Sequence, residues 1–484
     1  MKHPTNPSIG SDPASRERPA SPSTRTTLST RTDSCHQDQQ STPSTRKGKA
    51  PRRQAAPVRN GTKARQVAES VEIMAPAGSR ESLTAGLKAG AGAVYFGVGK
   101  LNMRAGTRNN FTVEDLPEIG AACREYGANS YLTLNTVMYD EDMDAMRTTV
   151  DAAADAGITA LIVSDPTVMQ YAREAGMNVH VSTQCNITNT GMVRFYAQWA
   201  DVMVMARELN LPQVARITRR IREENITGPS GKPVRIEMFV HGALCMAVSG
   251  MCYMSLHTHN SPANRGTCVQ NCRRPYEVRD QHSGTELQVD NEYIMSAGDL
   301  CTIGFLNKLV DAGVTVMKIE GRGRSADYVK TVVTCYREAL EAIREGTYTR
   351  AKVAGWEKEL ATVYNRGFWD GYYLGRTMGE WSDSYGSKAT VRKIYLAKCD
   401  NYYQKVNAGV FQMETGTLSK GDEIMVTGPT TGVIKMKAEE LRVEDAEVDK
   451  VRKGDLFTFV VPEKVRRADK LYKLVPASGN GTGK

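Results

Sequence analysis

The fold is indicated most directly by the stretch EIMAPAGSRESLTAGLKAGAGAVYFGV, which covers residues 72–98. It begins and ends with short apolar runs, Glu72–Ala75 and Ala93–Val98, which have the length of buried strands. Between them, Ser79–Ala89 repeats its apolar residues with helical spacing and is followed by Gly90, a residue type that commonly ends a helix. The stretch therefore predicts two parallel strands joined by a helix.

The same alternation of strand-like and helix-like segments continues far beyond this unit. Eight strand-like runs can be recognised: Glu72–Ala75, Ala93–Val98, Ser130–Asn135, Ala160–Ser164, Val179–Ser182, Val202–Ala206, Arg235–Val240 and Val316–Ile319. Eight parallel strands that alternate with helices predict an α/β fold closed into a (β/α)8 barrel of the TIM type, with a doubly wound open sheet as the alternative. No GxGxxG motif follows the first run, so a dinucleotide-binding fold has no support.

Changes in composition divide the chain into segments. Residues 1–68 are rich in Ser, Thr, Pro and Arg and lack apolar periodicity, as disordered tails do. From about residue 390, short strands separated by hairpin turns predict a small antiparallel β-barrel domain. We therefore expect a disordered basic tail (1–68), the barrel with a Cys-rich insertion (69–345), a helical and aromatic linker (346–389), the β domain (390–476) and a flexible tail (477–484).

Charge is unevenly distributed along the chain. The 484 residues carry a formal net charge of +9, and residues 1–68 alone hold thirteen Lys or Arg and four Asp or Glu. The remaining residues are therefore balanced, so a generally basic surface cannot be used to argue for nucleic-acid binding. No apolar stretch approaches the roughly 20 residues of a membrane span. Because no secretory signal is evident either, we expect a cytoplasmic protein with reduced thiols.

The strongest candidate site lies in the long insertion between the seventh and eighth strand-like runs. This insertion contains Cys245, Cys252, Cys268 and Cys272 within 28 residues, and Cys301 follows further along. Four thiols form the ligand set of an iron–sulfur cluster, and four thiols can also hold zinc. The paired CxxC arrangement common in zinc sites is absent. We therefore expect a metal centre, with an iron–sulfur cluster favoured and zinc as the alternative.

A second candidate site follows from the predicted barrel, because barrel enzymes carry out their chemistry where the carboxyl ends of the strands meet. The polar side chains expected at this mouth belong to Arg104, Arg108, Asn135, Gln184, Arg207, Glu208, Glu237, His241, Lys318, Glu320 and Arg322. Arginine presents a fork of donors that fits carboxylates and phosphates, so the mouth suits an anionic substrate. Ion pairing among these residues is the structural alternative.

Individual roles can be assigned within this mouth. The period of a strand places Glu237 and His241 on one face, where a carboxylate and an imidazole can act as a general acid–base pair. The residues predicted as catalytic are Glu237, His241, Arg207, Glu208, Lys318 and Glu320, and those predicted to bind substrate are Arg104, Arg108, Asn135, Gln184 and Arg322. Motifs of serine hydrolases, zinc proteases of the HExxH type and P-loop proteins are absent.

The string EMFVHGALCMAVSGMCYMS at residues 237–255 resembles the signature of peptidase family U32, the collagenase-like peptidases. The resemblance continues in APAG at 75–78, YFG at 95–97, STQ at 182–184, KIEGR at 318–322 and GDEIMVTGPTTG at 421–432. Val248 and Met251 depart from the signature, which affects the expected local packing, but neither departure removes a thiol.

The resemblance implies an activity as well as a fold. Members of the family are credited with collagen degradation or with iron–sulfur-dependent hydroxylation of RNA, and this chain is most similar to the branch of tRNA hydroxylation proteins. The resemblance implies a [4Fe-4S] cluster on Cys245, Cys252, Cys268 and Cys272, with Cys301 as the alternative fourth ligand. It also implies that wobble uridine in tRNA is converted to 5-hydroxyuridine, with prephenate as a dicarboxylate bound in the arginine-rich mouth.

Two other functions stay open at this point. One is a collagenase-like peptidase centred on Glu237 and His241. The other is a non-catalytic RNA-binding scaffold with structural zinc. The sequence leaves the oligomeric state undetermined.

Overall fold

The computed structural model of the chain describes residues 70–107, 110–276, 295–375, 379–382 and 386–477. The predicted basic tail, residues 1–68, lies outside this part of the chain, and so do all but the first residue of the predicted C-terminal tail. In the described part, no helix combines the length and the apolar character that a bilayer-spanning segment needs.

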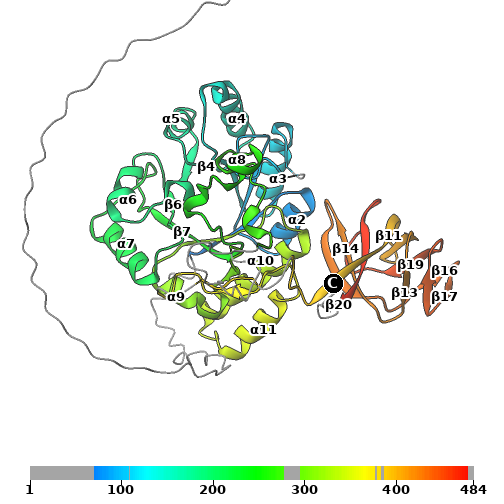
Figure 1. The fold of residues 1–484 in the computed structure, drawn as a ribbon. Helices are drawn as coiled ribbons and strands as arrows, with labels where there is room; N and C mark the ends of the chain where they lie inside the picture. Colours follow the sequence, from blue (N-terminus) through cyan, green and yellow to red (C-terminus); the bar gives the residue numbers. More distant parts are fainter. Residues whose placement is uncertain (1–69, 108–109, 277–294, 376–378, 383–385, 478–484) are drawn as a thin grey trace, which may run out of the picture. The chain divides into compact units, whose positions relative to one another are not determined.

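The central element is a closed parallel barrel (Figure 1). Its strands are β1 (Glu72–Pro76), β2 (Ala93–Gly97), β3 (Asn129–Leu134), β4 (Ala160–Val163), β5 (Asn178–Val181), β6 (Val202–Val204), β7 (Arg235–Gly242) and β9 (Val316–Ile319). Each strand pairs in parallel with the next, and β9 pairs in parallel with both β1 and β7, which closes the sheet. The predicted (β/α)8 fold is therefore confirmed.

Helices alternate with these strands. They are α2 (Arg80–Lys88), α3 (Leu116–Glu125), α4 (Met143–Asp155), α5 (Pro166–Glu174), α6 (Thr190–Tyr196), α7 (Leu211–Glu223), α9 (Leu306–Asp311) and α10 (Ala326–Glu345). Local sequence fixes several of their ends. The side chain of Ser79 accepts a hydrogen bond from the Ser82 amide at the start of α2, and Asp165 does the same for Thr167 at the start of α5. Gly346, with φ of 78°, ends α10 in the left-handed conformation that glycine adopts easily.

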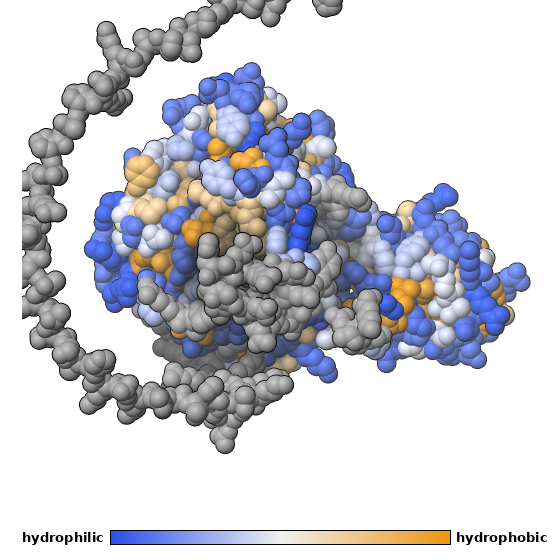
Figure 2. All heavy atoms as spheres, viewed as in Figure 1, coloured by the Kyte–Doolittle hydropathy of each residue, from blue (hydrophilic) through white to orange (hydrophobic). Residues whose placement is uncertain are grey.

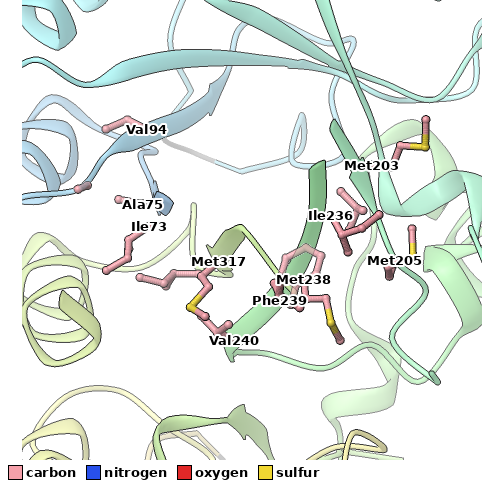
Figure 3. Close-up of a cluster of buried hydrophobic side chains, with 14 of the residues drawn as sticks. Ile73, Ala75, Val94, Met203, Met205, Ile236, Met238, Phe239, Val240 and Met317 are labelled. Carbon is pink, nitrogen blue, oxygen red and sulfur yellow. The ribbon is translucent and has the colours of Figure 1, made fainter. Parts of the chain in front are cut away.

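Alternate residues of the barrel strands face two different environments. One set, which includes Ile73, Met203, Ile236 and Met317, packs with the surrounding helices into the large apolar core, part of which is drawn in Figure 3. The other set forms a separate small cluster that fills the interior of the barrel, which we call the bore; its apolar members are Met74, Ala93, Tyr95, Tyr131, Ala160, Ile162, Val202 and Val316. On the face seen in Figure 2, polar residues cover much of the outer helices, and apolar residues gather nearer the centre of the barrel.

The insertion between β7 and β9 has its own structure. It contains the short helix α8 (Met254–His259) and the strand β8 (Asp299–Cys301), and its residues 277–294 lie outside the described part. Strand β8 pairs antiparallel with the end of β7 and parallel with β10 (Phe368–Trp369), so two strands extend the barrel sheet beyond the predicted eight.

Residues 346–389, predicted as a linker, contain the helix α11 (Arg350–Leu360) and the strand β10. Residues 365–375, which we call the rim segment, return to the barrel. The Tyr373 hydroxyl donates a hydrogen bond to the Phe239 carbonyl at 2.8 Å, and the Leu211 amide donates to the Tyr373 carbonyl at 2.9 Å. The rim segment is thus tied to β7 and to the start of α7.

The C-terminal region is an antiparallel β domain, as predicted. It comprises β11 (Val391–Tyr403), β12 (Ala408–Met413), β13 (Thr417–Ser419), β14 (Glu423–Gly428), β15 (Gly432–Lys437), β16 (Arg442–Val443), β17 (Ala446–Glu447), β18 (Lys450–Arg452), β19 (Leu456–Val460) and β20 (Lys470–Pro476). Its core is built around the rings of Phe411, Phe457 and Phe459, of which Phe411 and Phe459 stack with centroids 4.9 Å apart.

Candidate functional site

The carboxyl ends of the barrel strands and the insertion after β7 surround a cavity of about 290 Å³, which we call the mouth cavity. Residues from the barrel side that line it include Tyr95, Arg104, Asn135, Gln184, Arg207, Phe239, Lys318, Glu320 and Arg322. The insertion contributes Cys245, Cys252, Cys268 and Cys272 to the same lining. The two sites predicted from the sequence therefore share one cavity.

The four thiols of the insertion differ from the other cysteines in their surroundings. Cys245 and Cys268 are exposed and Cys252 and Cys272 are half-buried, whereas Cys301 is buried on β8 and does not line the mouth cavity. Burial raises the pKa of Cys272, the positive charge of the adjacent Arg273 lowers it, and the neighbouring thiols raise it further. The thiols of Cys245, Cys252 and Cys268 are thus close enough to Cys272 to change its pKa.

The donor set can be tested against the metal centres considered above. Among the described residues, no three His, Cys, Asp or Glu side chains are arranged to hold a single metal ion. A tetrahedral zinc site gathers its sulfurs at about 2.3 Å from one point, whereas a [4Fe-4S] cluster distributes its thiolates over several iron atoms. Four soft thiol donors that face one cavity fit the ligand set of a cluster, and these four cysteines are the residues that would hold it.

Positive charge dominates the lining of the mouth cavity. Seven cationic side chains line it: Arg104, Arg207, Arg273, Lys318, Arg322, Arg324 and Arg366. Within the described part of the chain, only three of them have a carboxylate within ion-pair distance, in the pairs Arg104–Glu320, Lys318–Glu237 and Arg366–Asp299. An excess of four positive charges remains, which favours a strongly anionic occupant.

Arg322 is the most enclosed of these cations. It is 8% exposed, and one guanidinium nitrogen donates to the Asn102 side chain at 3.1 Å and to the Thr133 hydroxyl at 2.7 Å. Burial lowers its pKa to about 10. Gly97, at the end of β2, makes room for it, because a Cβ atom there would lie 2.5 Å from the Arg322 guanidinium. Gly97 of the YFG sequence therefore leaves the space that the Arg322 guanidinium occupies.

Glu320 is the carboxylate at the centre of the cationic lining. It accepts a hydrogen bond from Arg104 at 2.6 Å and another from the Tyr95 hydroxyl at 3.3 Å. Burial alone would raise its pKa, but Arg104, Arg207 and Arg322 outweigh burial and hold the pKa at about 2. Glu320 is therefore an anion at neutral pH, and it orients cations rather than supplying a proton.

Neutral donors and acceptors form another part of the cavity wall. The Asn135 amide donates to the Ser182 hydroxyl at 3.0 Å and to the Gln184 carbonyl oxygen at 3.2 Å, and its own oxygen accepts from the Met103 amide. The structure thus brings together the two predicted amide residues, Asn135, which follows β3, and Gln184, which lies after β5.

The predicted acid–base pair requires a correction. Glu237 is fully buried and paired with Lys318 at 2.8 Å, whereas His241 is buried against the rings of Tyr328 and Tyr336 and does not line the mouth cavity. The register of β7 against β9 shifts between Phe239 and His241, so the simple alternation that places both residues on one face ends there. The structure therefore does not bring the predicted pair together: Glu237 and His241 lie in different environments, and neither lines the mouth cavity.

Other predicted residues fall on different sides of the cavity wall. Arg207 and Glu208 lie in the turn that follows β6. Arg207 lines the cavity and lies over the Phe239 ring at 3.8 Å, whereas Glu208 is exposed and is not part of the lining. Arg108 lies outside the described residues.

Three cations of the cavity were not predicted from the sequence. Arg273 donates to the carbonyls of Leu244 and Ala297, and Arg324 lies over the Tyr364 ring at 3.5 Å. Arg366 comes from the rim segment, which was read as linker. Arg273 could have been predicted, because it directly follows Cys272 in the sequence. Arg366 could not, because it reaches the cavity only through the return of the rim segment to the barrel.

The two departures from the family signature are located at the surface. Val248 is 59% exposed and Met251 is 66% exposed, and Tyr253 beside them is 80% exposed. The altered side chains therefore do not disturb a packed core.

The chain is similar in sequence to proteins that are named for two different kinds of activity. A "Collagenase" of Porphyromonas gingivalis is 58% identical over 402 residues, which cover 83% of this chain and 97% of that protein. "tRNA hydroxylation protein P1" of Bacillus subtilis is 30% identical over 418 residues, 84% of this chain and 96% of that protein. A 23S rRNA 5-hydroxycytidine synthase of Escherichia coli is 33% identical over 276 residues, 57% of this chain and 40% of that protein.

The model of the family described as "Peptidase family U32" matches residues 78–383, from the loop after β1 to beyond the rim segment. The matched residues include every residue that lines the mouth cavity. Together with the long alignments to its relatives, this match shows that the chain belongs to peptidase family U32.

Proposed function

We propose that this protein is an iron–sulfur-dependent enzyme that hydroxylates the wobble uridine of tRNA to 5-hydroxyuridine, with prephenate or a similar small dicarboxylate as a second ligand. The observation that carries the proposal is the convergence of four thiols and an excess of four positive charges on one cavity. The relatives named as tRNA and rRNA hydroxylation proteins support the choice of RNA as substrate.

Charge balance supports the pairing of a cluster with a dicarboxylate. A [4Fe-4S] cluster held by four thiolates carries a net charge of about −2 in its oxidised resting form. A dicarboxylate supplies another −2 at neutral pH. These two anions together would neutralise the excess of four positive charges in the mouth cavity.

In this proposal the cluster supplies redox chemistry when it is bound to Cys245, Cys252, Cys268 and Cys272. The chain's own residues bind and orient the other ligands. Arg207 and Arg322 lack a carboxylate partner within ion-pair distance among the described residues. One nitrogen of each guanidinium already donates to the protein, so the remaining donors are available to a carboxylate or phosphate. Asn135 and Gln184 offer neutral hydrogen bonds to a hydroxyl or to a nucleobase edge.

The proposal is tested by deleting the gene, digesting total tRNA to nucleosides and measuring 5-hydroxyuridine and its derivatives by mass spectrometry. We expect these nucleosides to disappear and to return when the wild-type gene is restored. Anaerobically purified protein should carry iron and acid-labile sulfide. Unchanged nucleosides in the deletion strain, or purified protein that contains zinc in place of iron and sulfide, would contradict the proposal. Zinc would instead support the RNA-binding scaffold.

A collagenase-like peptidase is the second candidate, because a relative that is 58% identical carries the name "Collagenase". A peptidase would need a catalytic group other than the pair Glu237 and His241, which lie in different environments. Purified protein, free of other proteases, should then cleave gelatin at a rate that scales with its concentration. Failure to cleave gelatin or collagen would remove this candidate.

A further inference from the structure

Behind the mouth cavity, the bore contains an ion pair that is shielded from solvent. Lys318 lines the cavity with only 4% of its surface exposed, and its ammonium donates to one oxygen of Glu237 at 2.8 Å. The Glu237 side chain is fully buried and is not part of the cavity lining. The Lys318 ammonium also lies over the Tyr95 ring at 4.6 Å. Lys318 therefore connects the cavity with a carboxylate that a ligand in the cavity does not reach.

Two polar atoms in the bore have no hydrogen-bonding partner among the described residues. They are the second carboxylate oxygen of Glu237 and the Nδ1 atom of His180, a residue of β5. Buried polar atoms of proteins are nearly always bonded to protein or to ordered water, and leaving one unpaired costs about 1–3 kcal/mol. Such an atom in a polar interior is therefore a site for a buried water molecule.

The two atoms belong to the same electrostatic environment. Burial, together with the charges of Lys318 and Arg235, lowers the pKa of His180 to about 3, so this imidazole stays neutral at physiological pH. A neutral imidazole accepts a hydrogen bond at one nitrogen and donates one from the other. The His180 ring also packs against the Tyr131 ring, with centroids 4.4 Å apart.

Polar groups continue from there to the amino-terminal end of the barrel. The Tyr131 hydroxyl donates to Glu72 at 2.9 Å, and Glu72 lies 3.8 Å from Arg235, whose side chain is 36% exposed. The titratable and charged groups that surround the Lys318–Glu237 pair are Glu72 on β1, Tyr95 on β2, Tyr131 on β3, His180 on β5, Arg235 on β7, and Glu320 and Arg322 after β9.

We propose that Lys318 is the proton-donating residue of the mouth cavity and that Glu237 and His180, joined by ordered water in the bore, return the proton to it from the opposite end of the barrel. Lys318 gives one proton to a basic oxygen of the bound ligand: an N–H bond breaks and an O–H bond forms. The neutral amine then takes a proton from the chain of water and side chains, and no electrons are exchanged. Glu237 and His180 are positioning residues, since neither lines the cavity. The inference rests on the proposed function for the identity of the ligand.

The first test does not depend on any activity. A high-resolution crystal structure of the full chain should show ordered water within hydrogen-bonding distance of the free Glu237 oxygen and of His180 Nδ1. Density that is empty at both atoms would overturn the proposal, whether or not the protein hydroxylates RNA.

The second test uses the hydroxylation of tRNA by purified protein. Glu237→Gln keeps the shape of the side chain but removes its proton affinity, so we expect the rate at saturating ligand to fall about 100-fold, with a shifted acid limb of the pH profile and a KM within about threefold of wild type. His180→Phe should lower the same rate to a smaller extent.

Glu338→Gln is the matched control, because Glu338 lies on α10 and accepts a hydrogen bond from the Trp356 indole. It should keep the wild-type rate within about twofold. Melting curves establish the folded fraction of each variant. A folded Glu237→Gln protein with wild-type rate and pH profile would overturn the relay and leave the proposed function standing. Loss of 5-hydroxyuridine chemistry from the wild-type protein itself would instead remove the proposed function, and the crystallographic test would then decide the relay.

Discussion

The barrel mouth and the β domain use the same residue types in opposite ways. In the β domain, Lys420 pairs with Glu447 at 2.7 Å at the surface, and Cys399 is buried in the apolar core. In the mouth cavity, Arg207 and Arg322 have no carboxylate partner among the described residues, and four thiols face the cavity. Pairing with Glu447 accounts for the Lys420 charge, and burial in the core accounts for the Cys399 thiol. The unpaired cations and the four thiols of the mouth cavity are instead the groups that the proposed ligands would bind.

The largest expected effect on the difference between the two regions comes from removing thiols of the mouth cavity. We expect the double variant Cys252→Ser, Cys268→Ser to lose nearly all of the iron and sulfide of the anaerobically purified protein, because thiolates are the ligands of the cluster. Iron and sulfide analysis with visible absorption spectra measures this. Cys399→Ala in the β domain is the control and should keep the wild-type iron content. Equal iron in all three proteins would contradict the cysteine assignment.

Whether the β domain influences the metal content of the mouth cavity can be tested from the other side. Phe411→Ala removes the ring at the centre of the β-domain core and should lower the free energy of unfolding of this domain by about 3–5 kcal/mol. Hydrogen exchange of β-domain peptides in the full chain measures the loss. Leu456→Ala, on the same sheet but 50% exposed, should change it little. A parallel loss of iron in Phe411→Ala would show that the two regions are coupled.

Removing one cation sharpens the difference in charge. Arg322→Met should weaken the binding of prephenate about tenfold to a hundredfold, because hydrogen bonds to a charged group contribute about 1.5–3 kcal/mol. Titration calorimetry measures the affinity. Lys420→Met removes a cation from the β-domain surface and should leave prephenate binding unchanged. If both variants bind as wild type does, the anion site lies elsewhere.

Acid sensitivity gives the smallest expected difference. Burial, together with the charge of Arg324, lowers the pKa of His241 to about 3. Below pH 6.5 the unfolded chain binds a proton that the folded chain does not, so the free energy of unfolding falls as the pH drops from about 6.5 towards 3, by up to about 1.4 kcal/mol per pH unit for this imidazole.

His241→Phe should make this dependence shallower by that amount, as denaturant unfolding at several pH values would reveal. His257→Phe, at an exposed position on α8, should keep the wild-type slope. The β domain contains no histidine, so the stability of this domain, measured by hydrogen exchange, should show no pH dependence that arises from a buried imidazole. An unchanged slope in His241→Phe would mean that the imidazole does not stay neutral in the folded protein.

The sequence predicted the barrel well because the strand-like runs alternate with helical patterns, several of which end at a glycine. It also predicted the lining residues Arg104, Arg207, Lys318, Glu320 and Arg322, since residues that follow barrel strands converge at one end. The catalytic or binding role of each of these five residues stays a prediction.

What the sequence did not predict has physical reasons. A register shift in β7 takes His241 out of the expected face, and such a shift depends on the pairing with β9 rather than on local residues. The strands β8 and β10 are only three and two residues long, too short for a periodic pattern. Arg366 reaches the cavity through a contact between distant parts of the chain, which no local pattern encodes.

The rim segment determines where this protein can be shortened. A fragment that stopped after α10 would keep all eight parallel strands but would lose Arg366 from the cavity and the Tyr373 hydroxyl that bonds to the Phe239 carbonyl. It would also leave β8 without its parallel neighbour β10. A truncated protein meant to retain ligand binding should therefore extend through Ser382, whose amide still bonds back to the Ser296 carbonyl.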